Sequence, residues 1–453
     1  MGRSLFGTRR PYTVVVRPER GTAARTGRSG GQRLLRRFLS KHVLIVGGGI
    51  IGLCTAHYAV KRGHRVTVIE RGARDRDSCS FGNAGMIVPS HIVPLAAPGV
   101  VPLALKWMWN PESPLYFKPR LDWDLLSWSW KFLRASTRAH VARAAPLIRD
   151  LSFASRACFE QLAETLEFGL VKRGLIMLCK TQHALDDEAR SAAFANGLGV
   201  PAEVLDAKAV AALEPGVRMN VAGGVLFPKD CHLAPDRLMA ALQSSLEAAG
   251  AEFRFGCEAH GWRVNARRIE ALLTSAGEFA ADEFVLSGGS WSPSLVRGLR
   301  ARIPMQAGKG YSLTLAQPRQ LPRACAIFTE ARIAVTPTGS SLRFGGTMEI
   351  AGLDERITER RVRGIIKAVP NYFPEFSPDD FAGVEPWCGL RPCSPDGLPY
   401  VGRFGAYDNL IAATGHAMMG LSLGPITGRL VAELLDRENP SHDLTLLSPD
   451  RFA

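Results

Sequence analysis

The sequence lacks Cys-x-x-Cys pairs, and no cysteine and histidine residues cluster at the spacing of a metal site. Its nine cysteines are an odd number, which argues against a disulfide framework. We therefore expect reduced thiols, a cytosolic setting and no bound metal. Long apolar runs are also missing. The longest, residues 92–105, is too short to span a bilayer and contains Pro94, Pro98 and Pro102, which exclude a membrane-spanning helix there.

Acidic residues are almost absent from residues 1–40, where Glu19 stands against ten arginines. This segment carries +9 of the chain's net charge of +14, so the remaining residues have an ordinary balance and no nucleic-acid partner is expected. The segment could be a disordered basic arm, an organelle transit peptide or upstream sequence from an over-extended gene start. We favour the last and expect a disordered tail, because the folded pattern begins abruptly at Lys41.

A dinucleotide-binding pattern follows at once. Residues 42–46 form a short apolar run typical of a buried parallel strand, and Gly47, Gly49 and Gly52 then stand at GxGxxG spacing before a helical segment. Glycine allows the tight turn, the close approach of backbone to a pyrophosphate and the close packing of helix on strand. A second strand ends in Glu70, which can accept hydrogen bonds from ribose hydroxyls. The whole unit predicts an adenine dinucleotide.

The rest of the chain favours FAD over the competing interpretation, NAD, because regular βαβ units do not continue after Glu70. Further strand-and-glycine units appear only at 282–292 and 409–420. We therefore expect one domain assembled from distant segments with a second domain inserted. The expected segments are 41–90, 215–300 and 380–440 for the FAD-binding domain, 91–214 and 301–379 for the substrate domain, and 441–453 for a C-terminal extension.

Over about residues 41–440 the sequence resembles the FAD-dependent D-amino-acid oxidase superfamily, and within it the small subunits of bacterial D-amino-acid dehydrogenases. Beyond the glycine turn, the resemblance rests on the stretches SFGNAGMIVPS, AAPGVVPLALKWM, GKGYSL, CGLRPCSPDGLPYVG and TGHAMMGLSLGPITG. It implies an α/β fold, with a discontinuous Rossmann-like FAD-binding domain and an inserted α+β substrate domain built on an antiparallel sheet. It also implies FAD as cofactor and hydride transfer from the Cα of an amino acid to the flavin.

Three residues are candidates for the chemistry. The resemblance implies that Arg391, in the GLRP motif, binds the substrate carboxylate, and a guanidinium suits this role because it forks onto a carboxylate with two hydrogen bonds. The alternative is an arginine that caps a turn or pairs with Asp396. Tyr311 could also hydrogen-bond the carboxylate, or could be a core residue. His416 is expected beside the flavin, where it could equally be a structural histidine bonded to backbone.

The cofactor contacts expected from the glycine turn and the resemblance are Gly47, Gly49, Ile50, Ile51, Gly52, Glu70, Arg71, Asn83, Ala84, Gly85, Met86, Gly288, Trp291, Gly415, Gly420 and Leu421. Some relatives attach flavin covalently through a cysteine near the GLRP motif. The spacing of Cys388 does not clearly match, so we interpret it as an ordinary buried thiol and expect FAD to bind non-covalently.

Tryptophan is concentrated in one segment, with Trp107, Trp109, Trp123, Trp128 and Trp130 close together among lysines and arginines. They could form a belt that contacts a membrane surface, although aromatic packing is the preferred interpretation. We expect a cytoplasmic protein, or one held peripherally on the cytoplasmic face of the inner membrane.

The leading functional hypothesis is a D-amino-acid dehydrogenase that passes electrons to a quinone or an electron-transfer partner. The enzymatic alternative is an oxidase or dehydrogenase of glycine, sarcosine or a cyclic imino acid such as D-hydroxyproline. A non-catalytic, flavin-binding relay subunit is a third hypothesis, and the intact GLRP motif argues against it, because such a subunit needs no carboxylate-binding arginine.

Overall fold

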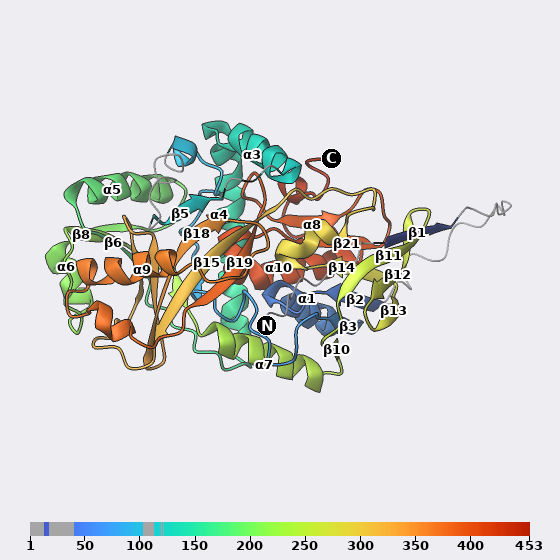
Figure 1. Cartoon of the computed structure of the whole chain (residues 1–453), viewed down its shortest axis with the longest axis horizontal. Helices are drawn as coiled ribbons and strands as arrows, with labels where there is room; N and C mark the ends of the chain where they lie inside the picture. Colours follow the sequence, from blue (N-terminus) through green and yellow to red (C-terminus); the bar gives the residue numbers. More distant parts are fainter. Residues whose placement is uncertain (1–12, 18–39, 103–112, 119, 121) are drawn as a thin grey trace, which may run out of the picture.

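A computed structural model describes residues 13–17, 40–102, 113–118, 120 and 122–453. Figure 1 shows two sheets side by side along the long axis of the molecule, with helices on their outer faces. The smaller sheet contains the segment predicted to bind the dinucleotide. Its six strands run in the order β10 (Glu252–Arg254), β3 (Arg65–Ile69), β2 (His42–Val46), β14 (Glu283–Leu286), β21 (Leu410–Thr414) and β20 (Tyr400–Arg403).

The first five of these strands are parallel, and β20 is antiparallel to β21. Both faces of the sheet are covered, which explains the unbroken apolar runs in β2 and β14. Helices α1 (Ile50–Lys61), α10 (Gly420–Leu435), α4 (Arg138–Leu162) and α7 (Pro235–Ala248) pack on or near one face. The other face packs against β11 (Ala259–Asn265) and β12 (Arg268–Thr274), where the ring of Trp262 meets that of Phe284 edge to face.

The larger sheet is mostly antiparallel. Its strands run in the order β19 (Trp387–Cys393), β15 (Gln306–Leu315), β18 (Ser341–Ile350), β17 (Ile333–Thr338), β16 (Cys325–Phe328), β6 (Leu175–Cys179), β8 (Gly223–Phe227) and β7 (Glu203–Asp206), with β5 (Leu115–Phe117) paired to β18. Only the β16–β6 and β18–β5 pairings are parallel. The helix α9 (Glu359–Tyr372) covers an aromatic core on one face, and α5 (Gln182–Gly197) and α6 (Ala207–Leu213) pack near β8.

The pairing of two strands differs from the expected domain segments. Strand β8 lies within 215–300 and β19 lies within 380–440, the ranges expected in the FAD-binding domain, but both strands are hydrogen-bonded in the larger sheet. Helix α4 lies within 91–214, yet it packs against α10 beside the smaller sheet. We therefore propose that the chain crosses between the domains more often than the sequence suggested. Sheet membership depends on distant pairing, which local motifs do not report.

The expectation that the whole of residues 1–40 is disordered is wrong for one segment. Residues Thr13–Arg17 form strand β1, which pairs in parallel with β11. They add an edge to a four-stranded sheet completed by β12 and β13 (Gly277–Ala280). The run Thr-Val-Val-Val has high strand propensity, and β11 offers an open edge for it. Residues 1–12 and 18–39 lie outside the described part of the chain.

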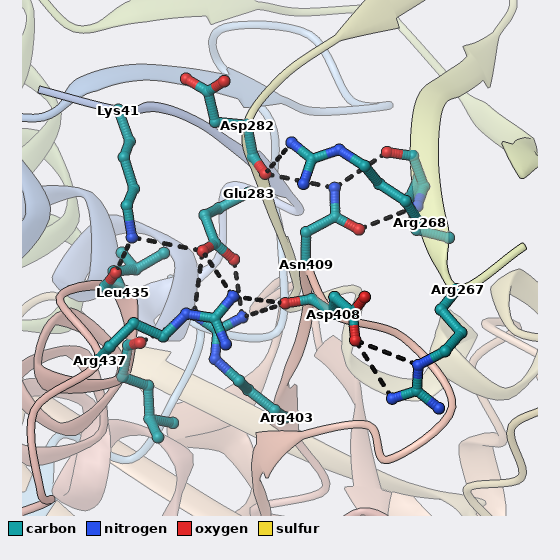
Figure 2. A network of polar contacts seen from close by, with 12 residues as sticks. Lys41, Arg267, Arg268, Asp282, Glu283, Arg403, Asp408, Asn409, Leu435 and Arg437 are labelled. Atoms are coloured by element: carbon teal, nitrogen blue, oxygen red, sulfur yellow. Dashed lines mark hydrogen bonds and ion pairs between the residues drawn. The ribbon is translucent and has the colours of Figure 1, made fainter. Parts of the chain in front are cut away.

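A buried carboxylate ties together the amino end of the smaller sheet (Figure 2). Glu283, at the start of β14, is only 3% exposed and accepts two hydrogen bonds from the guanidinium of Arg403, at 2.7 and 3.1 Å. The Lys41 ammonium lies 3.4 Å from the same carboxylate, and a nitrogen of Arg437 lies 3.6 Å away. Lys41 and Arg403 also donate to the backbone carbonyls of Leu435 and Leu434 at the end of α10. Residues that are far apart in the sequence therefore contact the single carboxylate of Glu283.

Candidate active site

A cavity of about 700 Å³ opens at the carboxyl ends of the parallel strands, between the two sheets. This is where open α/β sheets bind their ligands. Its walls come from the glycine turn after β2, the segment 76–91, the connection between β14 and α8 (Ser292–Leu295), the strands β15, β18 and β19, and the turn before α10. Its volume falls within the range of ligand and cofactor sites.

The glycine turn has the conformation that a pyrophosphate site requires. Gly47 has φ +110°, and its amide donates to the carbonyl of Ile69 at 2.8 Å. A Cβ at Gly52 would overlap the Gly47 carbonyl, so only glycine lets the helix begin this close to the strand. Gly49 is the N-cap of α1 and has no side chain to cap the first turn. The first turn of α1 can therefore direct backbone amides at an anion.

Glu70 stands at the carboxyl end of β3 and lines the cavity. Its two carboxylate oxygens accept from the amides of Gly48 and Gly72, at 2.8 and 2.7 Å. Each oxygen keeps a lone pair for a ribose hydroxyl. Arg76, which sequence reasoning missed, donates to the Gly48 carbonyl at 2.6 Å and fixes the turn from the other side. In the first turn of α1, the Ile50 amide donates to the Ser80 hydroxyl at 3.0 Å. The remaining amides of that turn and the Glu70 carboxylate fit an adenine dinucleotide.

Thirteen of the sixteen predicted cofactor contacts line this cavity. They are Gly47, Gly49, Ile50, Ile51, Glu70, Arg71, Asn83, Ala84, Met86, Gly288, Trp291, Gly420 and Leu421. The guanidinium of Arg71 lies 3.5 Å from the ring centroid of Trp291, so these two predicted residues are in contact in the cavity wall. Gly52, Gly85 and Gly415 are not part of the lining. They shape the backbone behind it, and Gly85 and Gly415 do so with φ of +78° and +79°.

Arg391 projects from β19 into the cavity. Its guanidinium lies across the face of Gly310 on β15, where any Cβ would overlap it. One nitrogen donates to the carbonyl of Thr347 at 2.8 Å, which orients the planar group. The alternative pairing with Asp396 is wrong, because that carboxylate is bound by Arg451 at 2.7 and 2.9 Å. Among the described residues no carboxylate lies within 4.0 Å of Arg391, and burial lowers the pKa of its guanidinium.

Tyr311 lines the cavity but does not offer a hydroxyl proton to it. Its hydroxyl donates to the carboxylate of Glu349 at 2.7 Å, and the Lys309 ammonium lies 3.7 Å from the same carboxylate oxygen. All three side chains are buried. Burial and this bond raise the pKa of Tyr311 far above its ordinary value. Because a substrate carboxylate can only accept, the arrangement argues against Tyr311 as its hydrogen-bond donor.

His416 is buried in the turn before α10 and lines the cavity. Its Nε2 lies 2.9 Å from the hydroxyl of Thr427, and its Nδ1 has no partner among the described residues. Burial lowers the pKa of His416 to about 3, so the ring is neutral at physiological pH. The structural alternative for His416 was a hydrogen bond to backbone, whereas its hydrogen bond is to the side chain of Thr427. The free Nδ1 is itself buried, and the neutral ring brings no charge to the cavity wall.

Sequence reasoning missed several residues of the wall. The ring of Trp387 lies between Gly82 and Gly389, and its indole nitrogen donates to Asp77. Its position two residues before the GLRP motif was an available signal. Thr347 has φ +72°, a conformation rare for a threonine, and no sequence pattern announces it. Cys388 is partly buried and its thiol donates to the Glu355 carbonyl at 2.9 Å, while burial raises its pKa.

Comparison with known proteins agrees with this geometry. The family model described as FAD dependent oxidoreductase matches residues 42–434. A protein named D-amino acid dehydrogenase from Bradyrhizobium diazoefficiens is 33% identical over 422 residues, covering 91% of this chain and 99% of its own length. One of the same name from Methylobacterium nodulans is 34% identical over 410 residues, covering 88% and 96%.

Solved structures show the same architecture. Glycine oxidase from Geobacillus kaustophilus superposes with a TM-score of 0.72 at 26% identity, over 91% of this chain and 99% of that one. L-proline dehydrogenase from P. horikoshii superposes with a TM-score of 0.69 at 18% identity, over 91% and 98%, a likeness of fold alone. The α/β fold, with its Rossmann-like dinucleotide domain, is confirmed, and the chain belongs to the FAD-dependent oxidoreductase family of flavoenzymes.

Proposed function

We propose that the protein catalyses the oxidative deamination of D-amino acids with FAD as cofactor. One observation carries the proposal: Arg391 presents a guanidinium to the cavity with no carboxylate of its own among the described residues. A fork of this kind matches the α-carboxylate that all amino acids share. The relatives named D-amino acid dehydrogenase support the choice of substrate class.

The chain's residues then divide into two tasks. The glycine turn, the start of α1 and Glu70 hold the dinucleotide, which when bound supplies the hydride acceptor. Arg391 holds the substrate carboxylate, and Thr347 and Gly310 fix the direction of its fork. Fixing the carboxylate restricts the direction of the Cα–H bond, and such positioning supplies much of the barrier reduction. His416, neutral and partly satisfied by Thr427, adds no charge that would oppose loss of the hydride.

The electron acceptor proposed is a quinone, reached by peripheral contact with the cytoplasmic face of the inner membrane. The support is helix α3 (Trp123–Ala135), whose outer face exposes Trp123, Leu126, Trp130 and Leu133. Trp123 is 85% exposed and Trp130 is 61% exposed. Basic residues on the same helix suit anionic headgroups. No helix within the described residues is long and apolar enough to cross a membrane.

Trp128, another tryptophan of the predicted cluster, does not share this exposure. Trp128 is only 2% exposed, stacks on Phe132 and donates to the Cys393 carbonyl at 2.9 Å. Trp107 and Trp109 lie outside the described residues. The preferred prediction of aromatic packing therefore applies to Trp128, and the belt hypothesis rests on two tryptophans of α3. Sedimentation with anionic vesicles tests it. A Trp123→Ser, Trp130→Ser double variant should lose binding, whereas Leu213→Ser, at an exposed apolar residue elsewhere, should retain it.

The proposed activity is tested by anaerobic mixing of the holoenzyme with D- and L-amino acids, glycine, sarcosine and D-hydroxyproline. Loss of the oxidised flavin absorbance with D-amino acids is the expected result. Faster bleaching by glycine, sarcosine or D-hydroxyproline would favour the alternative function. Arg391→Ala should lower kcat/KM by about two to three orders of magnitude, since truncating one partner of a shielded charged pair costs about 2–5 kcal/mol. Near wild-type efficiency in Arg391→Ala would refute the role of this residue.

A further inference from the structure

A second arginine lines the same cavity and no sequence motif points to its role. Arg332 directly precedes β17 and has φ +54°. An arginine in the left-handed region costs about 1 kcal/mol or more, and such strain clusters at functional sites. Thr347, also left-handed, lines the cavity as well. Ala417, with φ +48°, does so too, so the described wall contains three strained residues that are not glycine.

Strand register places Arg332 close to the carboxylate-binding arginine. Ala334 pairs with Gly345, and a Cβ on Gly346 would lie 3.3 Å from the side chain of Ile333. One step further along both strands, Arg332 comes opposite Thr347. The carbonyl of Thr347 is the group that orients Arg391. Both arginines therefore line the cavity near Thr347 of β18, Arg332 from the β17 side and Arg391 from the β19 side.

The charge of Arg332 is not neutralised by an ion pair. The side chain is exposed, and among the described residues it has no hydrogen-bond partner and no carboxylate within 4.0 Å. The charge of Arg332 acts to lower the pKa of Glu188, but burial outweighs it and the pKa of Glu188 is raised. His91, which also lines the cavity, has its pKa lowered to about 4 by burial and by Arg332. The positive field of Arg332 therefore reaches His91 in the cavity wall.

The surroundings strengthen the attraction that this cation can exert. Met177, Ile327 and Ala334, from three neighbouring strands of the larger sheet, line the cavity with it. A ligand that fills the cavity displaces water from between these apolar walls, so a charge pair formed with the ligand is less screened than one in open solvent. An apolar substrate side chain would leave the guanidinium without a partner, and an anionic one would pair with it.

We propose that Arg332 binds a second carboxylate of the substrate, so that the preferred substrates are D-amino acids whose side chains end in a carboxylate. The α-carboxylate lies on Arg391 and the side-chain carboxylate on Arg332. This inference rests on the proposed function and narrows its substrate class. Arg332 is then a specificity-determining residue, and Arg391 is the residue that all substrates require.

The test compares D-glutamate with D-glutamine, which has nearly the same shape and no side-chain charge. Wild-type enzyme should oxidise D-glutamate with a kcat/KM at least tenfold higher. Arg332→Met should lower kcat/KM for D-glutamate about 10- to 100-fold and leave D-glutamine within threefold. Methionine is a fair replacement because it carries the same left-handed backbone strain as arginine. Arg332→Lys should recover part of the preference, since an ammonium keeps the charge without the fork.

The matched control is Arg360→Met, at an exposed arginine on α9 that is not part of the cavity wall. It should leave both substrates unchanged, and an equal loss there would refute a local role for Arg332. Equal wild-type efficiency for the two substrates, unchanged in Arg332→Met, would overturn the inference while D-alanine oxidation keeps the proposed function. Absence of oxidation with every D-amino acid would instead overturn the proposed function, and the inference with it.

Discussion

Replacing Gly310 with alanine should disable substrate binding without touching any residue that contacts the dinucleotide. A Cβ at this position falls well inside 3.0 Å of both terminal nitrogens and the central carbon of the Arg391 guanidinium, a separation that real Cβ atoms do not show. Gly310 lies in the middle of β15 and pairs with Gly389 of β19, while on the β18 side the register shifts between Lys309 and Tyr311. The guanidinium is the free end of a long side chain, so it moves more easily than the paired backbone. The guanidinium must therefore leave its place over the strand and break its bond to Thr347.

The size of the effect follows from that displacement. A misplacement of about 1 Å at a positioning group costs about 100-fold in rate, and full loss of a shielded charged contact costs about 2–5 kcal/mol. We expect kcat/KM for D-amino acids to fall about 100- to 1000-fold in Gly310→Ala. Flavin content should stay normal, because the glycine turn and Glu70 are elsewhere.

The assay is steady-state reduction of an artificial electron acceptor, with flavin content measured by absorbance and stability by urea unfolding. Gly197→Ala, where a Cβ meets no atom within 4 Å, is the control for a glycine-to-alanine change and should keep full activity. Combining Gly310→Ala with Arg391→Ala should add little further loss, since both remove the same contact. Near wild-type kcat/KM in Gly310→Ala would refute the assigned position of the Arg391 fork.

Three further predictions concern stability. Glu283→Gln removes the buried negative charge that Lys41 and Arg403 share, and it should lower the free energy of unfolding by about 3 kcal/mol, measured by urea titration. A change below about 0.5 kcal/mol would show that the ion pairs of Glu283 do not stabilise the fold. Burial raises the pKa of Asp230 from 3.8 to about 7, so between these pH values the folded chain retains a proton that the unfolded chain releases. The free energy of unfolding should therefore fall as pH rises from about 4 to 7. Asp230→Asn should reduce this pH dependence of the urea midpoint, and an unchanged pH dependence would contradict the assignment. Removing residues 1–40 deletes β1 and should lower Tm by a few degrees while flavin content stays normal; an unchanged Tm would show that Thr13–Arg17 adds no stability.

The residues that local patterns assign to the cofactor lie together at one end of the cavity. The run 42–46, the three glycines and Glu70 lie within one strand–turn–helix–strand unit, so the residues that interact there are close together in the sequence. The same is true of Arg391, whose motif is contiguous. A site whose residues are neighbours in the sequence can be predicted from sequence motifs.

The partners that decide the substrate end come from distant strands. Tyr311 was an open choice because its Glu349 partner lies on the next strand of the sheet, and only the pairing of β15 with β18 brings them together. Thr347 and Arg332 owe their role to backbone conformations that no residue type demands. Strand β1 was missed because a short apolar run forms a strand only when an open sheet edge accepts it.

The order of strands in the smaller sheet has a consequence for the making of the protein. The central strand β14 lies between β2 and β21, which are separated by more than 360 residues of chain, and α10 packs against α1 only after the last strands exist. A chain emerging from the ribosome therefore holds the glycine turn long before the turn at His416 has been synthesised. The flavin cavity can close only when translation is nearly complete, so cofactor capture should follow release of the chain. Premature termination before β21 should yield chains that cannot retain flavin and that present β14 as an exposed apolar edge to the cell's proteases.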